Sequence, residues 1–361
     1  RMQQIDKIYQ RELDYTQEQI KARAANRAGD PTKYQNVIVP VVLPAVESAV
    51  TYQSSVFLTG IPLFGVSATA NAMDVALQME TIIDDQATRG GWIRELQLFF
   101  RDGFKYNLAA MEVEWAQEKT YIPTTNEIAG TPGASSTKLQ ETLWEGNKIR
   151  RLDLYNTIFD PRVIPAEIAS RGEFAGYSQV LSRVELVKYL QSLQFRLNYR
   201  EALECGFADL AGAENSEYFI PTVNLTSLLD PKLFTQFSWG QWAGLTDRKD
   251  AINFKNAYIK TVFYARVIPK DFGLPAAAPN QPQIWKFVFI NGSILVYAER
   301  QTNAHDLLPI LFSQPLEDGL GFQAKSLAQN SAPFQEVASA LVNSAIQARR
   351  RAVSDRGIYN P

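Results

Sequence analysis

Apolar residues recur at helical spacing in several separate segments of the chain. The first, residues 1 to 29, is rich in charge and ends at Asp30-Pro31, because proline disfavours helical backbone in the residue before it. The other predicted helices end or begin at a glycine break or a capping residue. They are residues 45 to 59, residues 72 to 88 and 92 to 109 on either side of Gly90-Gly91, residues 182 to 193 with Ser182 and Glu185 at capping-box spacing, and the long segment from 326 to 355.

Alternating apolar and polar residues predict strands in much of the remaining chain. The clearest signal is residues 285 to 299, where Asn291-Gly292 separates two alternating runs and predicts an antiparallel hairpin. A turn-rich loop is expected at residues 124 to 138, and residues 195 to 250 carry no clear pattern. Further strands are expected at residues 61 to 67, 109 to 123, 147 to 163, 256 to 268 and 307 to 312, with a proline-rich connector after residue 268. Together these elements predict a mixed α+β fold.

Composition excludes some classes of function. The chain has 361 residues, 46% of them apolar and 20% charged, which is typical of a folded globular protein. A formal net charge of −2 provides no global attraction to nucleic acid or to acidic membranes. One cysteine and one histidine, Cys205 and His305, are too few for a disulfide framework or a closed zinc site. The most apolar window, residues 37 to 60, is interrupted by prolines and polar residues, so no membrane span is predicted.

One stretch resembles the phosphate-binding loop of nucleotide hydrolases. Residues 319 to 326 spell G-x-x-x-x-A-K-S, with Ala324 where that loop requires a second glycine. Alanine is strained at positive φ, and no later apolar strand ends in an acid that could hold magnesium. We therefore interpret the stretch as a glycine-permitted turn at Gly319 that leads into a helix, with Lys325 and Ser326 in the first turn of that helix.

Three other candidates for chemistry are weaker. His305 and Asp306 are adjacent in sequence, and neighbouring residues rarely face each other as an acid–base pair. Asp84 and Asp85 would point about 100° apart on a helix, so they are not expected to share a metal. Cys205 has no partner base and is interpreted as a small core residue. No catalytic residue, metal site or cofactor is predicted.

The basic run Arg349, Arg350 and Arg351 lies near the end of the long C-terminal helix. Residues 334 to 353 carry a wide apolar stripe, and Arg349 falls within it at about 100° per residue. Arg350 and Arg351 lie on opposite shoulders of the stripe. We expect a helix that packs between neighbours, with the three arginines as candidate contacts to DNA phosphates or to another subunit.

The order of these segments resembles the portal, or head–tail connector, proteins of tailed bacteriophages, most closely those of short-tailed phages. The likeness covers most of residues 35 to 355 and depends on segment order. The segments that carry it are residues 39 to 66, similar to the helix that leads into the wing; residues 91 to 115, similar to a helix-then-strand unit; residues 147 to 163, with Asp-Pro after D-x-Y-N; and residues 283 to 351, similar to the wing hairpin, the "LLPI" strand and the following helix.

The resemblance implies a portal-type fold and a structural function without enzymatic chemistry. Residues 1 to 30 would form an N-terminal charged helix, residues 31 to 315 a wing-like α+β domain, and residues 316 to 361 a turn and a long helix that leads toward the stem and clip. Family members are usually longer, and the chain begins with Arg1, so we expect it to be a portion of a longer protein.

The expected assembly is a ring, generally of twelve subunits, at one vertex of the virion, assembled in the bacterial cytoplasm. Its partners would be other copies of the chain, the major capsid protein, the terminase motor, tail adaptor proteins and double-stranded DNA that passes through without sequence-specific contacts. Two alternatives stay open. One is another virion adaptor or collar protein, and the other is a nucleotide-binding enzyme that uses residues 319 to 326.

Overall fold

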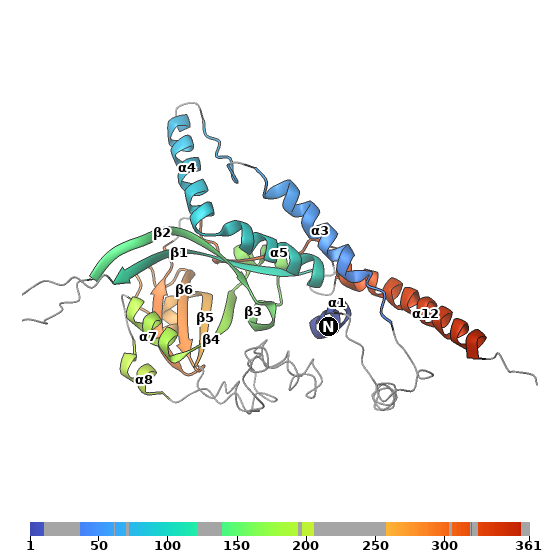
Figure 1. Ribbon diagram of the computed structural model, residues 1–361. Coiled ribbons are helices and arrows are strands. Elements are labelled where there is room, and N and C mark those ends of the chain that lie inside the picture. Colours follow the sequence, from blue (N-terminus) through green and yellow to red (C-terminus); the bar gives the residue numbers. More distant parts are fainter. Residues whose placement is uncertain are drawn as a thin grey trace, which may run out of the picture.

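The structure, a computed structural model, describes residues 1–10, 37–60, 62–69, 72–121, 139–193, 197–205, 258–302, 305–317, 319 and 324–354. The predicted mixture of helices with antiparallel strands is confirmed, including the long helix near the C-terminal end (Figure 1). The α-helices of the described residues are α1 (Met2–Gln10), α3 (Val42–Phe57), α4 (Met73–Arg89), α5 (Trp92–Tyr106), α6 (Ile168–Arg171), α7 (Arg183–Ser192), α8 (Tyr199–Glu204) and α12 (Leu327–Ser354).

The strands form two antiparallel sheets. A three-stranded sheet has the order β2-β1-β8, and a five-stranded sheet has the order β3-β4-β5-β6-β7. The strands are β1 (Ala109–Tyr121), β2 (Leu139–Leu152), β3 (Thr157–Phe159), β4 (Phe174–Leu181), β5 (Tyr258–Val267), β6 (Gln283–Ile290), β7 (Ile294–Arg300) and β8 (Ile310–Ser313). Short 3-10 turns lie at Leu154–Asn156, Pro165–Glu167 and Pro269–Phe272.

The largest core lies where the two sheets meet and where α7 and α8 cover the five-stranded sheet. Its members are apolar residues from the strands and helices that lie at most 7% exposed, among them Ala110, Leu186, Val262, Val288 and Ile310. Burial of this apolar surface supplies most of the stabilisation of the domain, at roughly 25 cal/mol per Å² removed from water. Figure 1 shows β1 and β2 crossing over the five-stranded sheet as a long curved pair.

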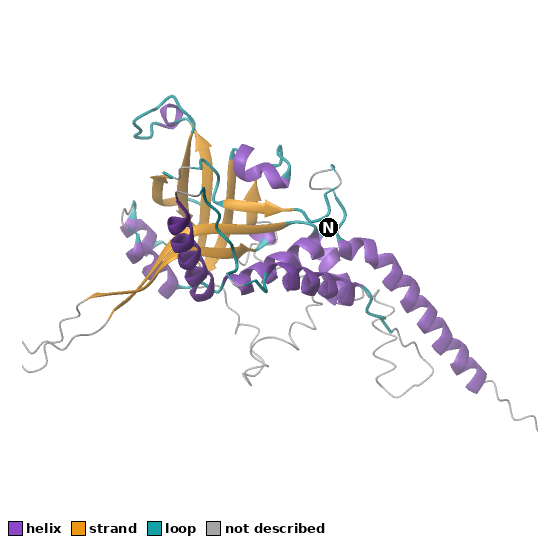
Figure 2. Cartoon of the chain, turned by 90° about the horizontal axis from the view of Figure 1, so that it is seen from above, coloured by secondary structure: helices purple, strands orange, loops and turns teal. Residues whose placement is uncertain are grey.

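A second, smaller core joins segments that are far apart in sequence. Ile5 of α1, Val42 and Val46 of α3, and Ala328 and Ala332 of α12 pack against one another, all at most 8% exposed. In Figures 1 and 2, α1, α3, α5 and the start of α12 lie together beside the sheets, and the rest of α12 extends away from the body. The division into three segments at residues 30 and 315 stays a prediction.

Several local predictions are confirmed. Asn291 and Gly292 both have positive φ, 51° and 72°, as the turn of the β6–β7 hairpin requires. Ser182 accepts a hydrogen bond from the backbone of Glu185, and the Glu185 carboxylate accepts one from the backbone of Ser182, so α7 begins with the expected capping box. The predicted charged helix at residues 1 to 29 is confirmed for Met2–Gln10 alone, as α1, because residues 11 to 36 lie outside the described residues. Residues 124 to 138 and 206 to 257 also lie outside them.

The predicted strand at residues 61 to 67 is wrong for the part that the structure describes. Residues 62 to 69 contain no strand and run beside α4. The backbone N–H of Leu63 donates to Asp84, at 3.3 Å, and that of Val66 donates to Glu80, at 3.0 Å. Carboxylates on the helix satisfy these donors, so the segment needs no neighbouring strand. The predicted strand at residues 147 to 163 also breaks, at the 3-10 turn after Leu152, into β2 and β3.

Candidate functional site

Helix α4 projects from the body (Figure 1); it has one buried edge, and residues 62–69 also run beside it. Ala76, Gln86 and Ala87 on that edge are at most 7% exposed. The Gln86 side-chain oxygen accepts hydrogen bonds from the backbone and the side chain of Asn147 in β2, at 3.3 and 2.9 Å. A Cβ at Gly146 would lie 2.9 Å from the Gln86 side chain, so glycine permits this close approach. The C-terminal half of α4 is thereby held on the three-stranded sheet.

The two flanks of α4 are apolar and exposed to solvent. At about 100° per residue, Met73 and Leu77 lie on one flank, and Val75, Met79 and Ile82 lie on the opposite flank. All five side chains belong to residues that are between 51% and 62% exposed: Met73, Val75, Leu77, Met79 and Ile82. The outer edge, between the flanks, carries Asp74, Gln78 and Asp85. We call the two groups the Leu77 flank and the Met79 flank.

A second exposed apolar surface lies on α12. Phe334, Val337 and Leu341 are 70%, 60% and 65% exposed, and Val342 is 37% exposed. Their spacing places them on one face of the part of the helix that extends away from the body in Figure 2. Large apolar patches on a soluble protein are typical of surfaces that bind another protein.

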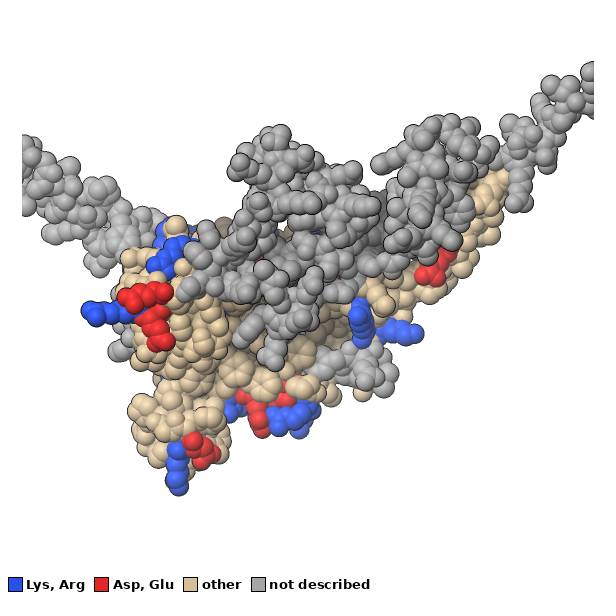
Figure 3. Space-filling view, turned by 90° about the horizontal axis from the view of Figure 1, so that it is seen from below, with Lys and Arg blue, Asp and Glu red and all other residues tan. Residues whose placement is uncertain are grey.

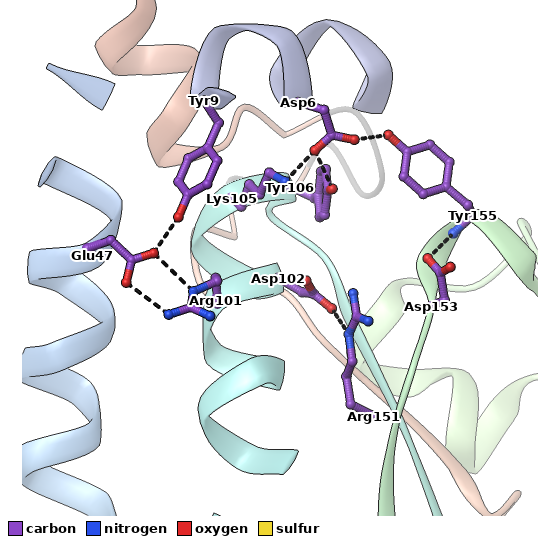
Figure 4. Close-up of polar contacts among 10 residues, drawn as sticks. All are labelled: Asp6, Tyr9, Glu47, Arg101, Asp102, Lys105, Tyr106, Arg151, Asp153 and Tyr155. Carbon is purple, nitrogen blue, oxygen red and sulfur yellow. Dashed lines mark hydrogen bonds and ion pairs between the residues drawn. The ribbon is translucent and has the colours of Figure 1, made fainter. Parts of the chain in front are cut away.

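A buried polar network around Asp6 of α1 joins α1 to α3, α5 and the segment after β2 (Figure 4). Asp6 is 6% exposed and accepts hydrogen bonds from the hydroxyls of Tyr106 and Tyr155, the first at 2.5 Å, and it pairs with Lys105. Lys105 also lies 4.8 Å from the ring centroid of Tyr9. Burial, followed by the hydrogen bond to Asp6, raises the pKa of Tyr106 well above its usual range, so this hydroxyl keeps its proton as a donor.

An ion pair between Arg101 of α5 and Glu47 of α3 extends the network. Arg101 binds the carboxylate of Glu47 with two hydrogen bonds of 3.0 Å, and the same carboxylate accepts the hydroxyl of Tyr9. Burial opposes ionisation of Glu47, but these donors outweigh it and hold the pKa of the carboxyl below its usual value. Burial, and then the hydrogen bond to Glu47, raises the pKa of Tyr9 to about 12. The network therefore fixes α1, α3 and α5 relative to one another.

Asp102 and Arg151 join α5 to β2. The Arg151 Nε donates to Asp102 at 2.5 Å, and burial raises the pKa of the Asp102 carboxyl despite this partner. Because both ions are largely removed from water, the pair contributes mainly to the fixed geometry of the helix on the strand.

A separate cluster of polar side chains lies between the two sheets. Glu112 of β1 is fully buried, pairs with Arg150 of β2 and accepts the hydroxyl of Tyr264 of β5 at 2.8 Å. Lys260 of β5 is 7% exposed, and its ammonium lies 4.4 Å from the ring centroid of Tyr189. Burial, followed by the charge of Arg150, lowers the pKa of Lys260 to about 8. Nothing in the sequence indicated this cluster, because its members come from different strands and a helix.

The structure describes Gly319 and residues 324 to 326 of the G-x-x-x-x-A-K-S stretch. Residues 324 to 326 lie immediately before α12, so Lys325 precedes the helix and does not lie in its first turn as predicted. Gly319 has φ +76° and Lys325 is exposed, while Ala324 and Ser326 are buried. The Ser326 hydroxyl accepts a hydrogen bond from the backbone of Gln329, and the Gln329 side chain accepts one from the backbone of Ser326. This reciprocal pair is a capping box, as expected for a turn that leads into a helix. Residues 318 and 320–323 lie outside the described residues.

The structure does not bring the other candidates together as paired sites. His305 accepts a hydrogen bond from the backbone of Leu307, whereas Asp306 pairs with Arg266. Asp84 accepts the backbone of Leu63, whereas Asp85 pairs with Arg89 on the same helix. Cys205 is half-buried and packs against the main core. In the described residues, no group of three or more histidine, cysteine or acidic side chains is arranged to hold a metal ion.

The three arginines lie on the last turns of α12. Arg349 is exposed and lies about 80° from Leu341 around the helix. Arg350 and Arg351 belong to the same helix, but their side chains lie outside the described part of the structure. On the face seen in Figure 3, basic and acidic side chains form small groups and no broad patch of one sign.

Comparison of the chain with protein-family models and with curated protein sequences yields no match. Among the helices that the structure describes, none combines the length and the apolar character needed to cross a membrane.

Proposed function

We propose that the chain is the subunit of a portal ring at one vertex of a phage capsid. In this function the ring conducts double-stranded DNA during packaging and ejection, and it binds the packaging motor, the major capsid protein and the tail adaptors. The order of segments described above and the exposed apolar helices support the proposal. The subunit number of twelve comes from the resemblance alone.

The observation that carries the proposal is the pair of opposite apolar flanks on α4. A projecting helix with exposed apolar residues on both flanks suits a position between two identical neighbours. If the Leu77 flank of one copy contacts the Met79 flank of the next, the interface is heterologous, and a heterologous interface generates a ring when its rotation closes. A two-fold dimer would need only one self-complementary face.

The exposed stripe of α12 supports the same arrangement. Phe334, Val337 and Leu341 would be covered by the neighbouring subunit, as expected for a stem-type helix. Arg349, close to the stripe, is a candidate contact to DNA phosphate or to a carboxylate of the neighbour. A net charge of −2 suits a conduit, because strongly basic walls would hold DNA by salt-dependent contacts at every subunit.

The test is the oligomeric state of the full chain, measured by native mass spectrometry and negative-stain imaging. The unmodified protein is expected to form closed rings with a central hole. A stable monomer at micromolar concentration would refute the proposal.

Two double variants test the contact between the flanks of α4. Met73→Glu with Leu77→Glu disables one flank, and Val75→Glu with Met79→Glu disables the other. Each variant alone is expected to stay monomeric, and an equimolar mixture is expected to form a dimer that contains one copy of each. Homodimers of either variant would indicate a two-fold interface. Gln78→Glu with Thr81→Glu, on the polar side of α4, is the matched control and should form rings normally.

The two alternatives give different results. An adaptor or collar protein would also form rings, and the ring size together with the location of the ring in the imaged particle would distinguish it from a portal. A nucleotide-binding enzyme would bind ATP, and Lys325→Ala would abolish that binding. The Ser326 hydroxyl already caps α12, which favours the structural interpretation of residues 319 to 326.

A further inference from the structure

Residues 37 to 41, which lead into α3, lie along one face of α12 and bind it through backbone hydrogen bonds. The backbone N–H of Val37 donates to Asn343, whose side-chain nitrogen donates back to the carbonyl oxygen of Val37, at 2.8 and 3.0 Å. The N–H of Val39 donates to Ser339 at 3.0 Å. The N–H groups of Val41 and of the next residue both donate to Gln335 at 3.1 Å.

The spacing of the two elements explains why this contact repeats. Four residues of an α-helix rise about 6.0 Å, and two residues of extended chain span about 6.6 Å. The side chains at 335, 339 and 343 are therefore spaced to match the N–H groups of residues 41, 39 and 37, respectively. Pro40, which has no N–H, occupies a position that this ladder does not use. We call residues 37 to 41 the strap.

Helix α12 has two parts that differ in their attachment. Ala328 and Ala332, before Pro333, are at most 8% exposed and belong to the small core with α1 and α3. After Pro333 the contacts are polar: Gln335 is 7% exposed and bonds to the strap and to the carbonyl of Ile8, while Phe334, on another face, is 70% exposed. Proline inside a helix removes the hydrogen bond to the carbonyl four residues earlier, here that of Gln329, and is a common cause of kinks.

We propose that the strap is a clamp that sets the direction of α12 beyond Pro333. Gln335, Ser339 and Asn343 hold the first turns after the proline, and release of the strap would let this part of the helix change its angle to the body. The strap and the apolar stripe lie on nearly opposite faces, about 170° apart at ~100° per residue. The clamp therefore determines which way Phe334, Val337 and Leu341 face. This inference stands whether or not the chain forms a ring.

The clamp can be weakened without touching the core. Ser339→Ala with Asn343→Ala removes the hydrogen bonds of Val37 and Val39 and leaves Gln335, which also donates to the carbonyl of Ile8, in place. The matched control is Ser344→Ala with Gln347→Ala, which changes one hydroxyl and one amide on the same helix outside the ladder. Both pairs replace the same classes of side chain with alanine, so their effects on helix propensity are similar.

Hydrogen exchange of the full-length chain is the first measurement. The amides of Val37 and Val39 are expected to exchange at least tenfold faster in the Ser339/Asn343 variant and less than twofold faster in the control. Core amides such as that of Val262 should keep their rates in both, which shows that the variants fold. Equal exchange of Val37 and Val39 in the variant and the unmodified protein would overturn the clamp.

A distance measurement tests the change of direction. Spin labels at positions 94 of α5 and 348 of α12, in a Cys205→Ser background diluted with unlabelled protein, report the angle of α12 to the body. The distance distribution is expected to be narrow in the control and to broaden or gain a second population in the Ser339/Asn343 variant. Adding Pro333→Ala, which restores a helical N–H, should narrow it again. An unchanged distribution in the Ser339/Asn343 variant would refute the role of the strap.

Discussion

Leu186 in α7 and Leu341 in α12 are the same residue type in the same kind of element, yet the first is fully buried and the second is 65% exposed. Leu186 belongs to the core between the sheets and their helices, where the chain covers its own apolar surface. Leu341 belongs to a helix whose apolar face has no cover within the described chain. The contrast separates two regions. The two packed sheets with their covering helices, which we call the sandwich, bury their own apolar surface, whereas the projecting helices α4 and α12 are suited to contact other molecules.

The sandwich also contains buried charge, as the network around Asp6 does. Glu112 is fully buried, and it contacts Arg150 and Tyr264 from two different strands. The charged residues of α4 are instead paired near the surface, as Asp85 is with Arg89. A buried ion makes a fold sensitive to the loss of one partner, whereas a surface pair contributes little.

The largest expected effect is therefore at Glu112. Glu112→Ala leaves the guanidinium of Arg150 partly buried without its main partner, and we expect a loss of about 3–5 kcal/mol in the free energy of unfolding. Urea unfolding followed by circular dichroism measures it. Glu173→Ala, at a surface pair with Arg162, is the control and should cost less than about 1 kcal/mol. Similar costs at both positions would remove the distinction between the two regions.

The next effect compares the two leucines directly. Leu186→Ala should cost about 2–5 kcal/mol, because it removes a fully buried side chain. Leu341→Ala should change the stability of the monomer by less than about 0.5 kcal/mol. Both are measured by urea unfolding in the Met73→Glu, Leu77→Glu background, which is expected to stay monomeric. A large loss at Leu341 would mean that its side chain is covered within a single chain.

A gain in stability is expected at Lys260. Burial lowers its folded-state pKa from 10.5 to about 8, so the unfolded chain holds this proton more tightly. The resulting penalty, roughly 3 kcal/mol, is complete below pH 8 and fades as the pH rises toward 10.5. Lys260→Met should therefore stabilise the protein at pH 7 and much less at pH 10, measured by urea unfolding at both values.

Lys188, exposed on α7, is the control for this pH dependence, and Lys188→Met should leave stability unchanged at both pH values. If Lys260→Met destabilises the protein at pH 7, the ammonium of Lys260 contributes more through its contact with Tyr189 than burial costs it.

The smallest effect concerns a feature that both regions share. α7 of the sandwich and α12 each begin with a capping box, at Ser182 and at Ser326. Ser182→Ala should cost about 1 kcal/mol, because the cap satisfies a backbone donor that the helix leaves free. Ser326→Ala should cost as much or more, since Ser326 is fully buried. Thermal unfolding compares the two, and a neutral Ser182→Ala would show that this cap does not stabilise α7.

Local signals predicted the type and the ends of many elements. Asn291-Gly292 identified the β6–β7 hairpin, because few residue pairs other than Asn-Gly adopt positive φ at both positions without strain. The glycine pair at 90 and 91 separated α4 from α5, and Gly91 has φ +65°. In these cases the cause of the structure lies within a few residues of the effect, so a pattern in the sequence is sufficient.

Which face of a strand is buried was predicted less well. In β1, which was predicted as a strand, Met111 is buried, but Trp115 on the same face is 59% exposed and Glu112 on the other face is fully buried. Met111 packs in a separate apolar cluster with Trp92 and Leu96 of α5, while Glu112 faces the second sheet. A strand with cover on both faces does not show simple alternation.

The strap was missed for the same reason. Gln335, Ser339 and Asn343 look like ordinary solvent-facing residues of an amphipathic helix, and their partners lie about 300 positions earlier in the chain. The predicted strand at residues 61 to 67 failed because the carboxylates of Glu80 and Asp84 bind its backbone donors. In both places a helix side chain takes the role that a neighbouring strand usually has.

The sequence by itself determined most of the longer helices, the hairpin, the capping box at Ser182 and the mixed α+β class, because these follow from backbone preferences and short-range hydrogen bonds. Only the tertiary structure decided that Glu112 and Lys260 are buried, that the strap lies on α12, and that α4 exposes apolar residues on two flanks. Such outcomes depend on which distant segments meet, and the free energy of burying a charge or an apolar face is set by those partners and not by the residue alone.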